Sequence, residues 1–124
     1  MNFIDSAIPV ALMGDGISSL VRQCLELACH PGGLVLMEEP EAFKHPAAIS
    51  NVAAALMDAA HRKTQIFVTT HSLELIDDLL EHAGSSAEEI AVYRMRLQDG
   101  ALVCSRFSGE QALELRKLIE EDLR

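Results

Sequence analysis

The sequence has little positive charge. Only 10 of its 124 residues are lysine or arginine, against 19 aspartates and glutamates, which gives a formal net charge of −9. Neutralising nucleic-acid phosphates requires clustered basic side chains, and those of this chain are scattered. We therefore expect no direct nucleic-acid binding by this chain. The hydrophobic content of 49% excludes a disordered acidic tail, and the length corresponds to one domain at most.

Cysteines, leader signals and long apolar runs are also scarce. The cysteines, Cys24, Cys29 and Cys104, are odd in number and show no CxxC spacing. This pattern argues against a zinc site or a disulfide framework and favours buried thiols in a reducing compartment. The first residues lack the basic-then-apolar pattern of a signal peptide, and no apolar stretch reaches the length of a membrane span. We expect a soluble, cytoplasmic protein without membrane contact.

Two apolar runs end abruptly in chemically capable side chains. They occupy residues 34–41 and 66–72. Continuous apolar runs are typical of parallel strands covered on both faces, and ligands collect outside the carboxyl ends of such strands. If the two strands are neighbours, Glu38, Glu39 and His71 converge on one edge of the sheet. Carboxylates and a histidine at that edge are the groups that a metal–phosphate site needs.

The elements around these runs predict an α/β protein. Apolar residues at helical spacing predict three helices, over residues 17–28, from Pro46 to residue 60, and from Leu73 to near Gly84. Residues 14–16 start the first helix, either as a special motif or because Asp15 caps its own helix.

The C-terminal part predicts a hairpin followed by a helix. Asp99-Gly100 is a turn signal between strands over residues 90–97 and 101–107. Residues 108–111 have the spacing of a capping box for the last helix. Residues 87–89, by contrast, are expected to form a flexible loop.

Three segments carry a resemblance to a known family. Residues 34–41 resemble the Walker B strand of ABC-class ATPases, in the form used by the AAA-type core of overcoming-lysogenisation-defect and abortive-infection-like proteins. Residues 69–72 resemble the switch-histidine loop of that family, and residues 13–16 stand in the place of its signature motif. The resemblance runs from about Pro9 to the C-terminus. It implies a partial P-loop NTPase sheet, ABC-ATPase-like, with flanking helices and a C-terminal β-hairpin plus helix, so that residues 1–124 form one C-terminal segment of an ATPase core domain.

The resemblance also implies a role for each candidate residue. Glu39 would polarise the attacking water, Glu38 would hold Mg²⁺ through a coordinated water, and His71 would contact the γ-phosphate of ATP. The helix start at Gly14, Asp15 and Gly16 would offer an anion site to nucleotide held by a second protomer. ATP and Mg²⁺ are thus the expected ligands of a completed site.

Several departures set this chain apart from the family pattern. Glu38 replaces the Walker B aspartate, Gly14 takes the position of the signature serine, and Lys44 stands where leucine is usual. No GxxxxGK[ST] run is present, and none of the seven glycines is followed by lysine, so the loop that grips the β- and γ-phosphates is missing. The implied ATPase activity therefore needs a P-loop half or a homologous ATPase protomer as partner.

Other readings of the same residues stay open. Glu41 is expected to be an ordinary solvated turn residue, and His30, His61 and His82 are expected on the surface. The first alternative function is a non-catalytic interaction module that docks on an ATPase partner. The second is a small metal-dependent hydrolase with Glu38, Glu39, His45 and His71 as ligands. A sheet without its P-loop strands should also leave an apolar face or edge uncovered and favour association.

Overall fold

The computed structural model describes residue 9, residue 12 and residues 14–119. Met13 of the signature-like segment and the last five residues lie outside the described residues, so the expectations for them stay predictions. Within it, the predicted α/β organisation is confirmed. Helices and strands alternate up to residue 89, and a hairpin and a helix follow.

Two small sheets form, both where the sequence predicts strands. In the first, β1 (Leu34–Glu38) pairs with β2 (Gln65–Thr69) in parallel, and the register places Glu38 opposite Thr69. In the second, β3 (Ala91–Gln98) and β4 (Ala101–Ser108) form an antiparallel hairpin around the turn at residues 99 and 100. The two sheets are not hydrogen-bonded to each other within the described residues.

Each predicted helix is present. They are α1 (Asp15–Cys29), α2 (Pro46–His61), α3 (Leu73–Ala83) and α4 (Gly109–Ile119). Local chemistry fixes three of their starts. Pro46 opens α2, the Ser72 hydroxyl accepts from the Leu75 amide at the start of α3, and Ser108 and Gln111 exchange the two bonds of a capping box.

One predicted loop is instead helical. Residues 87–89 belong to a 3₁₀ helix, η2 (Gly84–Glu89), and the Ala87 side chain in it is buried. The expectation of a flexible loop was wrong because it rested on polarity alone. Ala87 packs with Met57 of α2 and Ala83 of α3, which anchors the segment.

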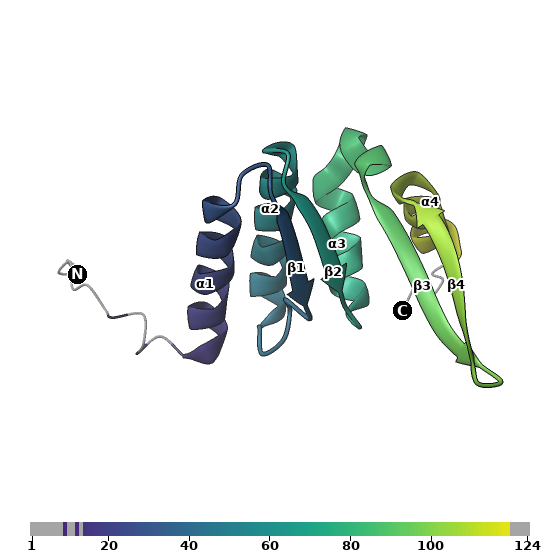
Figure 1. Cartoon of the computed structure of the whole chain (residues 1–124), viewed down its shortest axis with the longest axis horizontal. Coiled ribbons are helices and arrows are strands. Elements are labelled where there is room, and N and C mark those ends of the chain that lie inside the picture. The colour runs from purple at the N-terminus through teal and green to yellow at the C-terminus, as the bar shows by residue number, and fades with distance from the viewer. Residues whose placement is uncertain (1–8, 10–11, 13, 120–124) are drawn as a thin grey trace.

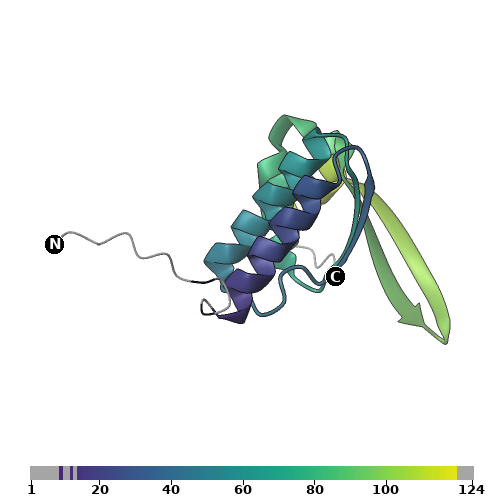
Figure 2. The ribbon, with the colours of Figure 1, turned by 60° about the vertical axis from the view of Figure 1, so that its left-hand side comes forward.

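The helices lie on one side of the strands, as Figures 1 and 2 show from two directions. The main core forms between α1, α2 and the inner face of the first sheet, where Val35, Met37, Ile66 and Val68 point. Helix α3 belongs to two cores, because Leu75 packs in this cluster while Ile76 and Leu80 pack against the hairpin and α4. The other face of both sheets has no such layer in the described part of the chain.

That outer face is apolar and exposed. Leu36 is 73% exposed and Phe67 is 54% exposed, and Leu34 beside them is exposed as well. The outward side of the hairpin adds further large apolar side chains, namely Tyr93, Met95, Leu97 and Leu102. The expectation of an uncovered apolar face is confirmed.

The cysteines correct an expectation. Cys24, Cys29 and Cys104 are all exposed rather than buried. Among the described residues, helix α1 stands at the end of the helical layer, with α2 beside it (Figure 1). Cys104 lies opposite Met95 on the outward side of the hairpin. The three histidines expected at the surface, His30, His61 and His82, are exposed as predicted.

Candidate functional site

The candidate site lies where β1 and β2 end. Pairing continues one residue beyond the sheet, because the Glu39 amide donates to the Thr69 carbonyl at 2.8 Å. The chain then turns sharply. Glu39 has a φ of 42°, in the left-handed region that residues with a Cβ rarely adopt. This turn takes the chain after Glu39 off the line of the strand.

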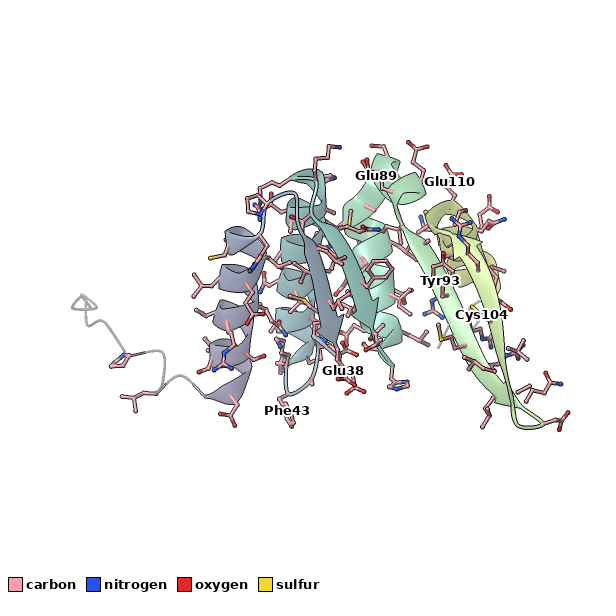
Figure 3. The ribbon with its side chains drawn as sticks, in the orientation of Figure 1. Glu38, Phe43, Glu89, Tyr93, Cys104 and Glu110 are labelled. Carbon is pink, nitrogen blue, oxygen red and sulfur yellow. The ribbon has the colours of Figure 1, made fainter. Side chains whose placement is uncertain are left out.

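Glu39 and His71 are brought together at this edge. The Glu39 Oε1 and His71 Nε2 atoms are 3.8 Å apart, and the two side chains are 50% and 86% exposed. Glu38 occupies the last position of β1 on the outward face, at the same edge of the molecule (Figure 3). A carboxylate and an imidazole that face solvent at this distance leave room for a third group to contact both.

Glu41 is not the solvated turn residue that the sequence led us to expect. Its Oε1 atom accepts a short hydrogen bond from Thr70 Oγ1, across 29 residues of sequence. The other carboxylate oxygen, Oε2, is buried and has no hydrogen-bond partner among the described residues. Thr70 Oγ1 in turn accepts from the Ser72 amide at 2.9 Å. Glu41 therefore connects the turn after β1 to the loop that carries His71.

Lys44 fastens the same turn to α1. Its Nζ atom donates to the Pro40 carbonyl at 2.6 Å and to Ser19 Oγ at 3.0 Å. Gln23 of α1 donates to the same carbonyl at 3.1 Å. Burial lowers the pKa of Lys44 below its ordinary value of 10.5, while the neighbouring charges of Glu41 and Cys24 act in the opposite direction. Lys44, at the position where leucine is usual in the family pattern, thus makes polar contacts that a leucine could not make.

The start of α1 lies against this turn. Gly14 is the N-cap residue with a φ of 78°, and no side chain caps the helix, so the reading in which Asp15 caps its own helix was wrong. A Cβ on Gly16 would lie 2.9 Å from the Phe43 carbonyl oxygen, so glycine permits this close approach. A shallow hollow of about 240 Å³ runs along the first turns of α1, lined by Asp15, Ser18, Ser19 and Arg22.

The comparisons with known proteins concern the family and the fold of the chain. Residues 5–77, more than half of the chain, match the family described as "AAA domain, putative AbiEii toxin, Type IV TA system". The chain belongs to this AAA family. The matched range contains all of the candidate site residues, from Gly14 to His71.

Two individual proteins resemble this AAA-family chain. The uncharacterized protein MJECL11 of Methanocaldococcus jannaschii is 36% identical over 113 residues, which cover 90% of this chain and 99% of that protein. A solved structure from work on ATP-driven dimerization and DNA-stimulated activation of SMC ATPases superposes with a TM-score of 0.60 at 17% identity. The match covers 91% of this chain and 65% of the SMC chain, so this chain spans less than two thirds of that ATPase.

The fold of the AAA-family chain is therefore a partial P-loop NTPase fold, as expected from the three motifs. Its family membership connects it to ATPase function and to ATP as the ligand class. None of the helices in the described residues combines the length and the apolar content that a membrane crossing requires.

The structure does not bring together the ligand set of the metal-hydrolase alternative. Among the described residues, no three histidine, cysteine, aspartate or glutamate side chains gather closely enough to hold a metal ion. His45 is also committed elsewhere, because its ring accepts a hydrogen bond from the Ala47 amide at the start of α2. The four side chains of that hypothesis do not form a ligand set.

Proposed function

We propose that this chain is the Walker B and switch half of an ABC-type ATPase site, which hydrolyses ATP with Mg²⁺ once a P-loop-bearing chain completes it. The approach of Glu39 to His71, 3.8 Å apart at the carboxyl edge of β1 and β2, carries this proposal. The roles divide by position. Glu39 polarises the attacking water, His71 contacts the γ-phosphate, and Glu38 holds Mg²⁺ through a water. Phosphoryl transfer depends mainly on such positioning and charge neutralisation.

The charges explain why a partner is needed. Three glutamates lie at or beside this edge, in a chain with a formal net charge of −9. Alone, they repel an anionic nucleotide, and Mg²⁺ and the lysine of a P-loop supply the missing positive charge. The start of α1, at Gly14, Asp15 and Gly16, then faces nucleotide held by the second protomer. Because such a site uses the cellular ATP pool, we place its action in the cytoplasm.

The exposed apolar face supports docking of the proposed partner. The outer face of the first sheet exposes Leu34, Leu36 and Phe67, and Glu38 of the candidate site ends the same face of β1. Exposed apolar patches of this kind are typical of protein interaction sites. A P-loop-bearing chain with an apolar face and a basic site edge would complement both the patch and the carboxylates.

The test uses the chain together with a P-loop half of the same family. Glu39→Gln should abolish steady-state phosphate release while nucleotide still binds, because the amide keeps the size and hydrogen bonding of the carboxylate but is no base. His71→Ala should also impair turnover. Glu38→Asp restores the usual carboxylate length and should hold or raise the rate. Calorimetric titration of the chain alone with Mg-ATP should show weak binding or none, and low-micromolar affinity would contradict the half-site.

The alternative is a non-catalytic module that docks on an ATPase partner. Glu38 in place of aspartate and the bare outer face favour it. The two functions separate cleanly in the same assay. If the chain binds the P-loop half and Glu39→Gln leaves the rate unchanged, Glu39 has no catalytic role and the docking function stands.

A further inference from the structure

The contact between Glu39 and His71 is too weak to fix the positions of the two residues relative to each other. Its atoms are 3.8 Å apart, beyond hydrogen-bond distance, and both side chains are largely exposed. Exposed ion pairs of this kind contribute between nothing and about 1 kcal/mol, because solvent screens them and ordering two side chains costs entropy. Some other contact must therefore keep the histidine loop opposite the turn after β1.

The Glu41–Thr70 hydrogen bond is placed to do this. It joins the turn two residues after Glu39 to the residue directly before His71. The accompanying bond from the Ser72 amide to Thr70 Oγ1 fixes the residue directly after His71. Both are partly buried, and the one to the Glu41 carboxylate belongs to the stronger class of hydrogen bonds, those to a charged group. The backbone of His71 is thus held on both sides.

Hydrogen bonds to α1 fix the position of the turn after β1. The Pro40 side chain is fully buried, and its carbonyl accepts from both Lys44 and Gln23. Lys44 bridges further to Ser19. Loss of these donors would leave a buried carbonyl unsatisfied, which costs more than the bonds themselves contribute.

We propose, building on the proposed ATPase function, that Glu41 and Thr70 are positioning residues that keep His71 in register with Glu39. Neither side chain reacts. The Glu41 carboxylate holds the Thr70 hydroxyl, and Lys44 holds the turn that presents Glu41. Loss of either member of the pair frees the histidine loop while β1 and β2 stay paired.

The first experiment needs only the chain itself and measures amide hydrogen exchange at Ser72. Thr70→Val removes the hydroxyl at nearly constant shape, and exchange at Ser72 should rise about tenfold, as expected for one lost hydrogen bond. Glu41→Ala should have the same effect, and the double variant should add little. Thr64→Val is the matched control. It deletes a comparable bond, from Thr64 Oγ1 to the His30 carbonyl at 3.0 Å, at the opposite end of β2. Unchanged exchange in Thr70→Val, or an equal rise in Thr64→Val, would overturn the proposal.

The second experiment uses the completed ATPase. Thr70→Val should lower kcat at least tenfold with little change in KM, and Thr70→Ser should restore it, because serine keeps the hydroxyl. If exchange at Ser72 rises in Thr70→Val but kcat does not fall, the positioning role is wrong. If instead Glu39→Gln leaves turnover intact, the ATPase function fails, while the exchange result still decides whether Glu41 and Thr70 hold the loop.

Discussion

Glu39 adopts a backbone conformation that costs free energy. Its φ of 42° brings the Cβ of an L-residue close to the backbone, at a cost of roughly 1–2 kcal/mol. The turn is kept by two backbone hydrogen bonds, from the Glu39 amide to Thr69 and from the Ala42 amide back to the Glu39 carbonyl at 2.9 Å. Strain retained by its surroundings is a recurring property of functional positions.

This strain predicts an inverted effect of glycine. Glu39→Gly and Glu39→Ala both remove the carboxylate, but only glycine relieves the conformation, so Glu39→Gly should have the higher free energy of unfolding by about 1 kcal/mol. Urea denaturation of the chain measures this. Glu38 provides the control, because it lies in the extended strand β1, where glycine should be worse than alanine. The same order at both positions would show that Glu39 carries no strain.

Lys44 predicts a stability that depends on alkaline pH. Burial lowers its pKa below 10.5 in the folded chain. Between the lowered value and 10.5 the unfolded chain binds more protons than the folded one, so the free energy of unfolding gains a contribution that grows with pH across this window. Lys44→Met lacks this contribution. Urea denaturation of both chains should show wild type gaining relative to Lys44→Met as the pH approaches 10.5. A difference that is constant with pH would contradict the burial.

The sequence predicted that Glu39 and His71 meet at one edge of the sheet, but not what holds them there. Both follow apolar runs directly, and strands that end together bring their next residues together. Glu41 and Thr70 lack such a signal, because a glutamate and a threonine that are 29 residues apart in sequence give no indication that they are in contact. The expectation that the cysteines are buried was wrong for a similar reason. Helical spacing identifies an apolar face on α1, but nothing in the sequence says that α1 stands at the end of its layer.

At the scale of elements, the backbones of η2 and α4 approach each other closely. A Cβ on Gly109, the first residue of α4, would lie 2.1 Å from the Ala87 carbonyl oxygen of η2. The Gly109 amide also donates to the Ile90 carbonyl at 2.9 Å. The backbone of the last helix therefore rests directly on the 3₁₀ segment, with no space for a side chain.

Gly109→Ala sets this contact against helix propensity. Alanine favours a helix over glycine by about 1 kcal/mol at most, whereas forcing backbone apart in a packed region costs roughly 3 kcal/mol. The clash should win, and the variant should unfold at lower urea than wild type. Glu110→Ala, at the exposed neighbouring position, should change stability little. A Gly109→Ala chain as stable as wild type would mean that η2 can move away from α4 at little cost in free energy.

Local signals were sufficient for most elements and insufficient for their assembly. Proline at the start of α2, the serine cap of α3 and the capping box of α4 each act over three or four residues, so the sequence displays them. The division of the strands into two separate sheets has no local sequence signal. In the described residues no hydrogen bonds connect the two sheets, and they are linked instead by α3, which packs against both.

At the scale of the whole molecule, the bare outer face predicts self-association. Leu36 and Phe67 occupy exposed positions at its centre. Sedimentation of the chain alone should show dimers or larger species, and Leu36→Lys with Phe67→Lys should shift it toward monomer without lowering the melting temperature. Lysine at the exposed Leu25, which lies in helix α1 and not in either sheet, is the control and should leave association unchanged. A wild-type chain that is strictly monomeric at high concentration would argue that the face needs no cover.

The same face has a consequence for the life of the protein in a cell. Chaperones and proteases act on chains that expose apolar surface, and the Leu34–Glu38 and Gln65–Thr69 strands expose apolar side chains in the native state. On the proposed function, a folded copy without its P-loop partner should therefore be degraded faster than a copy in the complex. Its cellular amount should follow the supply of the partner rather than the rate of its own synthesis.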